Sequence, residues 1–292
     1  MPRLKLLGVN VDIMEEDEMM QEIFRLSKQN YHARIVLLNK RLLMSAKFHK
    51  ELFNIINSAD LVIPVSKSIR NGLNFLSKKA YSVLPAYRQP ILTPFSFAIH
   101  LLSYFTEIEQ SVYLLGGSKK LIKGAEKNVK DSYPGIKLMG VYHTKYKKDF
   151  EQKLLTSIYK IAPNLLIISK KSPKAEYWLS KQKEKLPNGV SVIIEDFIYE
   201  IGEKVIKPTD RIRYALHKKI KNFFSIPSAI IRHFLFLTYL FNYKIFNLEN
   251  KVKKEKIKIN KKKEKHKKEK IKFPKEDKNR KINYETAHHS VY

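Results

Sequence analysis

The segment of this sequence best suited to hold a ligand is Leu114-Leu-Gly-Gly-Ser118, where an apolar run passes into a helical pattern. Glycines at such a turn, here Gly116 and Gly117, let backbone N–H groups approach a ligand, and the N-terminus of the following helix favours phosphate. A Gly-Gly turn between a strand and a helix is also a common structural device. The sequence has neither the GxGxxG dinucleotide fingerprint nor the Walker lysine motif. From the turn alone, a phosphate contact and a purely structural role both remain open.

A second candidate is Ser172-Pro-Lys-Ala-Glu-Tyr-Trp178, which also follows an apolar run and opens a helical pattern. Pro173 suits the first turn of a helix, and Lys174 and Glu176 are expected at the mouth of a pocket. A capped helix with solvated charges is the alternative. Asn39 follows an earlier apolar run and is either a ligand contact or a helix cap.

Cysteine and histidine usage limits the remaining chemistry. The chain has no cysteine, which excludes disulfides, thiolate metal sites and cysteine nucleophiles. Its nine histidines show no spacing typical of metal ligands, so we expect neither a metal site nor a cofactor. The N-terminus lacks an apolar stretch long enough for a signal peptide, and we expect a protein kept on the cytoplasmic side.

The elements that must position these residues alternate between short apolar runs and longer helical patterns. The expected strands are 34–38, 61–63, 111–115, 136–141, 165–168 and 190–194, and the expected helices include 40–57, 119–131, 147–161 and 174–185. Near-continuous apolar strands separated by helices are typical of a parallel sheet covered on both faces. The sequence therefore predicts an α/β fold with an open, mostly parallel, Rossmann-like sheet and ligands at the carboxyl ends of its strands.

The pattern changes after Pro208. Residues 211–222 indicate a basic helix, and residues 223–246 are strongly apolar and aromatic but interrupted by charges. From 250 to 281 the chain holds 17 Lys/Arg and 5 Asp/Glu, which is typical of a disordered tail. We expect three parts: an α/β domain at 1–208, a helical membrane-docking appendage at 209–249, and a lysine-rich disordered tail at 250–292.

The appendage is expected to lie in the membrane interface, because Arg232 near the middle of the apolar segment is costly inside a bilayer. Packing on the α/β domain or at an oligomer interface is the alternative. The residues expected to dock on the membrane are Phe223, Phe224, Arg232, Phe234, Phe236, Tyr239 and Phe241. The net charge of +29 indicates an anionic partner, either acidic lipid, nucleic acid or a phosphorylated ligand.

The order of several short segments resembles the WecG/TagA/CpsF family of bacterial glycosyltransferases. The resemblance rests on the opening LGVNVDIM, on ADLVIP (59–64), on VYLLGG (112–117) with YPGI (133–136) after it, on the segments at 163–166 and 172–178, and on Gly202 and Pro208. It covers about residues 5–210. It implies transfer of N-acetylmannosamine or a related sugar from a UDP-sugar to a lipid-linked acceptor. It also implies a substrate site that includes Asn39, Arg88, Gly116, Gly117, Lys174 and Glu176.

The departures from the family pattern fall on its polar site residues. The family's proposed general base is an aspartate, and this position holds Val65, which cannot accept a proton. Asp60, Glu195 and Asp196 are the nearby carboxylates that could substitute, but Asp60 occupies a position at which the family has a structural aspartate. Other polar positions of the family are occupied here by Leu37, Ala175, Ile198 and Ile206.

Three interpretations remain open. The first is an active, metal-independent transferase in cell-envelope polysaccharide or glycolipid synthesis. It would use a UDP-sugar donor and a lipid-linked acceptor at an anionic membrane surface, as a monomer or homo-oligomer. The second is a catalytically inactive family member that acts as a membrane-associated scaffold. The third is nucleic-acid binding through the lysine tail, which is disfavoured because no recognised DNA- or RNA-binding motif is present.

Overall fold

The computed structural model describes residues 2–81, 92–144, 146, 148–202 and 226–246. Its centre is a six-stranded parallel sheet in the order β4-β3-β8-β7-β5-β6. The strands are β3 (His32–Leu38), β4 (Leu61–Pro64), β5 (Ser111–Gly116), β6 (Lys137–Tyr142), β7 (Leu165–Ser169) and β8 (Gly189–Ile193). All six predicted strands are therefore present, and the α/β fold is confirmed.

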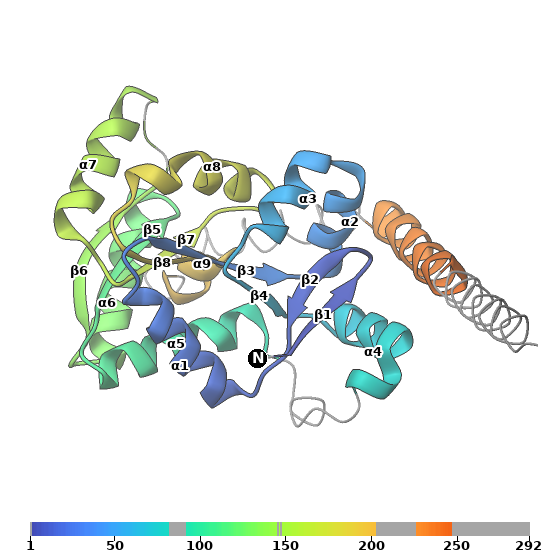
Figure 1. Cartoon of the computed structure of the whole chain (residues 1–292). Coiled ribbons are helices and arrows are strands. Elements are labelled where there is room, and N and C mark those ends of the chain that lie inside the picture. Colours follow the sequence, from blue (N-terminus) through green and yellow to red (C-terminus); the bar gives the residue numbers. More distant parts are fainter. Residues whose placement is uncertain (1, 82–91, 145, 147, 203–225, 247–292) are drawn as a thin grey trace, which may run out of the picture. The chain divides into compact units, whose positions relative to one another are not determined.

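Helices cover both faces of this sheet (Figure 1). On one face α1 (Glu16–Ser27), α5 (Pro94–Glu107), α6 (Lys119–Ser132) and α9 (Phe197–Gly202) bury apolar side chains against the strands. On the other face, α7 (Glu151–Ile161) and α8 (Lys174–Gln182) pack on β5, β7 and β8. Short 3₁₀ turns, η2 (Lys148–Phe150) and η3 (Lys183–Lys185), flank these two helices.

The predicted helix over 40–57 is two helices, α2 (Lys40–Phe48) and α3 (Lys50–Asn57). His49 between them has extended backbone angles, φ −129° and ψ 101°, so the helix cannot continue through it. The periodicity of the apolar residues persists across the break, which is why the pattern indicated a single helix.

A short antiparallel hairpin, β1 (Arg3–Leu6) with β2 (Val9–Asp12), precedes the sheet. Leu7 and Gly8 form its turn, both with positive φ. The hairpin packs beside α4 (Lys67–Tyr81), and Leu6 approaches Gly72 of that helix.

Residues 226–246 are helical, which agrees with the expected helical C-terminal region. Phe236 and Leu240 are buried and contact α4 at Gly72, where a Cβ would lie 3.1 Å from Phe236 Cζ. Tyr239 makes an edge-to-face contact with Phe48 at the end of α2. The structure describes no helix with both the length and the hydropathy that crossing a membrane requires.

The chain divides into two compact units, residues 1–242 and residues 243–292. The expected boundary at 208 and the lysine-rich tail lie outside the described residues, as do Arg88, Phe223 and Phe224.

Candidate functional site

The candidate site is the edge of the sheet at which its parallel strands end. β5 and β7 are neighbours there, and their connections leave in opposite directions: α6 covers one face on the way to β6, and α8 covers the other on the way to β8. Such a switch point leaves a crevice beyond the strand ends, where open α/β sheets bind ligands. Gly116 and Ser169 are the last residues of the two strands.

The glycine pair predicted to cradle a phosphate is covered by an apolar side chain. A Cβ on Gly116 would meet Ser169 Cβ at 2.6 Å and Ile198 Cγ1 at 2.8 Å, and a Cβ on Gly117 would meet Ile198 Cγ2 at 2.9 Å. Gly117 also has φ +63°, a conformation that favours glycine. The glycines therefore allow α9 to pack closely on the end of β5.

The position at which the resemblance implies a general base is apolar in structure as well as in sequence. Val65 follows β4, is 6% exposed, and belongs to the apolar cluster on the face covered by α1, α5, α6 and α9. Its backbone N–H donates to Leu38 O at 3.1 Å. No proton transfer can run through this side chain.

A polar network joins the loops that follow three of the strands. Glu195, after β8, accepts a hydrogen bond from the Ser172 backbone N–H, after β7, at 3.0 Å, and it pairs with Arg41 at the start of α2. Arg41 also donates to Ser172 O at 3.4 Å. Asp196 beside Glu195 has φ +58°, an uncommon conformation for a residue with a side chain. Of the three substitute carboxylates, Glu195 and Asp196 therefore lie at the ligand-binding edge.

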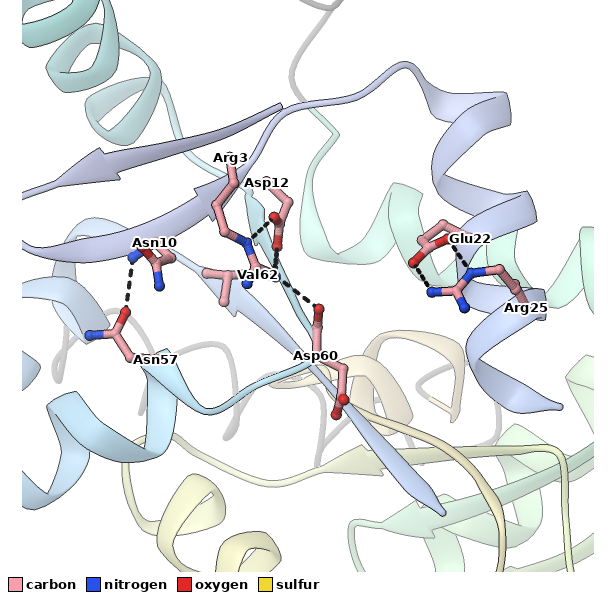
Figure 2. A network of polar contacts seen from close by, with 8 residues as sticks. All are labelled: Arg3, Asn10, Asp12, Glu22, Arg25, Asn57, Asp60 and Val62. Atoms are coloured by element: carbon pink, nitrogen blue, oxygen red, sulfur yellow. Dashed lines mark hydrogen bonds and ion pairs between the residues drawn. The ribbon is translucent and has the colours of Figure 1, made fainter. Parts of the chain in front are cut away.

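Asp60 lies at the opposite edge and has a structural role. It precedes β4, and its Oδ2 accepts the Arg34 backbone N–H at 2.8 Å. The neighbouring Asp12 carboxylate is buried, pairs with Arg3 at 2.6 and 2.9 Å, and accepts the Val62 N–H at 2.8 Å (Figure 2). Arg3 also donates to Asp60 O at 3.1 Å. Asp60 is therefore structural, as its place in the family pattern implies, because its carboxylate is at the amino ends of the strands.

The remaining predicted site residues occupy different environments. Asn39 caps α2, with its side chain accepting the Leu42 N–H at 2.9 Å. Lys174 is exposed at the start of α8. Glu176 is only 2% exposed, so the expectation that it sits at a pocket mouth is wrong. It is buried together with Ala175 and Leu179 of the same helix.

Burial sets the ionisation of Glu176. Desolvation raises its pKa to about 7, and the Arg34 guanidinium, itself buried on β3, partly offsets this. Glu176 Oε2 and two of the Arg34 nitrogens have no hydrogen-bond partner among the described residues. Arg34 is instead held by Ile55 O at 2.6 Å and by Ser58 Oγ at 3.1 Å. The burial of Arg34 was not predicted from the sequence. The feature that could have indicated it is the position of a charged residue at the start of an apolar run.

Basic and aromatic side chains complete the surroundings of the β7 loop. Lys170 lies over the Trp178 ring, 5.0 Å from its centroid, and burial lowers the pKa of this lysine. Trp178 Nε1 donates to Glu151 at 2.5 Å. The described residues contain no group of three or more His, Cys, Asp or Glu side chains that could hold a metal ion.

Two comparisons with known proteins bear on this site. A family model described as "Glycosyl transferase WecG/TagA/CpsF family" matches residues 4–245, most of the chain. No curated protein matches the chain.

Proposed function

The chain belongs to the WecG/TagA/CpsF glycosyltransferase family, and we propose that it transfers a sugar from a UDP-sugar to a lipid-linked acceptor in cell-envelope polysaccharide or glycolipid synthesis. The donor sugar implied by the resemblance is N-acetylmannosamine or a close relative. The observation that carries the proposal is the family match over a sheet whose strand ends converge at one edge.

The charge at this edge supports a diphosphate-containing donor. Lys174 is exposed at the N-terminus of α8, Lys170 and Lys171 lie on the loop before that helix, and Arg41 lies at the start of α2. A nucleoside diphosphate brings negative charge, which basic side chains and a helix N-terminus both stabilise.

We place the pyrophosphate near the loop after β7, since Ile198 covers the glycine pair at the end of β5. Asn39 and Arg88 are proposed to face the sugar, as the resemblance implies.

Glu195 is our candidate for the general base. It follows the central strand β8, it is partly exposed, and its contacts with Arg41 and Ser172 both use Oε1. Oε2 therefore remains to accept a proton from an acceptor hydroxyl, if the hydroxyl comes within hydrogen-bonding distance.

In a second candidate function, the protein has the same fold and the same membrane association but no catalytic activity. The apolar side chains of Val65 and Ile198 at the strand ends favour it. Under this alternative the protein is a membrane-associated scaffold of the same assembly and has no turnover.

Membrane attachment is proposed to use the exposed face of the helix at 226–246. Eight large apolar side chains are exposed there, at spacings that place most of them on one stripe: Ile226, Ile230, Ile231, Phe234, Leu237, Phe241, Ile245 and Phe246. An exposed apolar stripe of this size marks an interaction surface. The Phe236 ring is unavailable to lipid, because it is 2% exposed against α4, so its assignment to the docking set is wrong. Tyr239 is half-buried against Phe48.

The occupant we propose for this stripe is the inner face of the cytoplasmic membrane. The sequence that follows is the lysine-rich tail, which would be attracted to anionic lipid. Insertion of the stripe and electrostatic attraction of the tail together would provide the two signals that stable anchoring needs. Oligomerisation through the same stripe is the competing occupant.

Calorimetric titration of UDP and UDP-sugars into the full-length protein tests donor binding. We expect saturable binding that Lys174→Ala weakens, with Lys130→Ala as the control because Lys130 is also an exposed lysine but lies on α6, where it pairs with Glu126. Binding of RNA with no binding of UDP would favour the nucleic-acid interpretation.

A further inference from the structure

The exposed apolar stripe of the helix at 226–246 contains one polar point. Residues spaced by three and four lie on one side of a helix, and from residue 226 this spacing gives Ile226, Ile230, His233, Leu237 and Phe241. Four of these side chains are large, apolar and exposed. The fifth is the imidazole of His233, which is also exposed. The surface proposed to contact lipid therefore has a hydrogen-bonding group near the middle of its apolar row.

His233 contacts a lysine of the α/β domain. Lys40, the first residue of α2, has its Nζ 3.2 Å from His233 Nδ1. A lysine ammonium can only donate, so Nδ1 accepts and the ring carries its proton on Nε2. Nζ has two further hydrogens and Nε2 has one, so both groups still have hydrogens to donate to a ligand.

The positive charge at this contact is not compensated by an acid. None of the ion pairs among the described residues includes Lys40, whereas its neighbour Arg41 pairs with Glu195. Lys47, two turns further along α2, also lies beside the helix at 226–246, with Nζ 5.3 Å from the centroid of the Tyr239 ring. The side of α2 next to this helix is therefore basic and favours an anionic ligand.

A phosphate on a lipid is the anion that suits this position. Phosphate oxygens can accept from an ammonium and from an imidazole N–H through charge-assisted hydrogen bonds. A terminal phosphate leaves these oxygens open, unlike a diester that is covered by choline. Because Ile230 and Leu237 on either side of His233 are apolar and exposed, a group bound at His233 lies where lipid headgroups meet acyl chains.

We propose that Lys40 and His233 bind the terminal phosphate of a lipid headgroup, with the acyl chains of that lipid along the apolar stripe. The proposal rests on the proposed attachment of the stripe to a membrane, and it adds a preference for one kind of headgroup. Lys40 lies between Asn39 and Arg41, the partner of Glu195. A lipid held there has its headgroup beside the edge at which the strands end.

The test measures the affinity of the full-length protein for phosphatidylcholine vesicles that contain either phosphatidic acid or phosphatidylserine, adjusted to the same zeta potential. Phosphatidic acid has a terminal phosphate, and matched potentials make the attraction of the lysine-rich tail equal for the two vesicles. We expect about tenfold tighter binding to phosphatidic acid, from charge-assisted hydrogen bonds to its phosphate. Lys40→Ala and His233→Ala should each reduce this preference to less than about twofold, and their affinity for phosphatidylserine vesicles should change little.

Two further variants serve as controls. Lys40→Arg keeps a charged donor at this position and should retain the preference. Lys127→Ala should also retain it, because Lys127 is an exposed lysine on α6, which packs on β5 and β6 at the other end of the sheet from β4.

Three results would overturn the proposal. Equal affinity of the unmodified protein for the two vesicles, or an unchanged preference in both alanine variants, contradicts this proposal alone. Release from phosphatidic acid vesicles by millimolar glycerol 3-phosphate would show that the site takes soluble phosphate, against its assignment to a lipid. Absence of binding to every vesicle would contradict the attachment of the stripe as well.

Discussion

Ile198 lies directly over Gly117, so that a Cβ on the glycine would come within 2.9 Å of Ile198 Cγ2. These residues are far apart in sequence but join the end of β5 to the start of α9. The close approach continues along α9, where a Cβ on Gly202 would lie 2.5 Å from Leu121 O of α6. Glycines that resemble a phosphate turn in sequence are therefore used here for helix packing.

Adding a methyl group at Gly116 should destabilise the protein. Gly116→Ala would force Ser169 and Ile198 apart, and overpacking of this kind costs about 1–3 kcal/mol. Gly135→Ala is the control, because its Cβ would make only an ordinary 3.6 Å contact with Thr106. Urea unfolding of both variants measures the difference. Equal stabilities would show that α9 does not pack on β5 as described.

The two ion pairs in Figure 2 should differ strongly in their contribution to stability. Asp12 is buried and also accepts the Val62 N–H, so Asp12→Ala removes the ion pair with Arg3 and leaves that amide unpaired. We expect a loss of about 2 kcal/mol in the free energy of unfolding, mainly because the buried Val62 amide loses its acceptor. Glu22 and Arg25 form an exposed pair one turn apart on α1, and Glu22→Ala should cost about 0.5 kcal/mol. Denaturant titration tests this, and similar losses for both variants would contradict the structural role of Asp12.

Stability should fall as pH rises through neutrality because of Glu176. Its folded-state pKa of about 7 is above its ordinary value of 4.5, so the protonated carboxyl is the favoured form in the buried position. The contribution to stability is complete below pH 4.5 and is lost as pH rises through 7, by about 3 kcal/mol at most. Arg34 and Glu195 are the charged groups that act on it.

Glu176→Gln keeps the shape of the protonated side chain and cannot ionise. Its unfolding free energy should therefore be higher than that of the unmodified protein at pH 8, with the difference close to zero at pH 4. Thermal unfolding at the two pH values measures this. A variant that is less stable at both values would indicate that the Glu176 carboxylate is the stabilising form.

Several features could be predicted from the sequence and several could not. The six strands were predictable because buried parallel strands are continuous apolar runs, as in the segment 34–38. The β1–β2 hairpin was not, since its strands have four residues each with polar side chains among them.

The burial of individual charged side chains could also not be predicted from the sequence. The local sequence around Glu176, at the start of a helix, does not distinguish a solvent-exposed side chain from a buried one. Its burial depends on how α8 packs in the folded chain. The contact of Ile198 with Gly116 joins distant segments, and no local spacing encodes it. Phe236 and Phe234 are two residues apart in the same apolar segment, yet one is 2% exposed and the other 67%.

Membrane binding should depend on the exposed stripe and on the tail separately. The double variant Phe234→Ser, Phe241→Ser removes two exposed rings and should weaken binding to anionic vesicles at least about tenfold, given the size of the apolar area lost. Truncation after Glu249 should remove most of the salt dependence, because each lysine near an anionic surface contributes about 1 kcal/mol. Vesicle co-sedimentation in low and high salt tests both. Unchanged binding by both proteins would exclude this mode of attachment.

Release of UDP from UDP-N-acetylmannosamine, measured with the full-length protein and a membrane-lipid extract, tests the transferase proposal most directly. We predict release that requires the lipid extract and falls at least about a hundredfold in Glu195→Gln, in line with the contribution of a general base. Val65→Asp alone should give no large gain, because catalytic groups act as a unit and the neighbouring positions are apolar. Saturable UDP binding without lipid-dependent release would contradict the transferase proposal and establish the scaffold alternative.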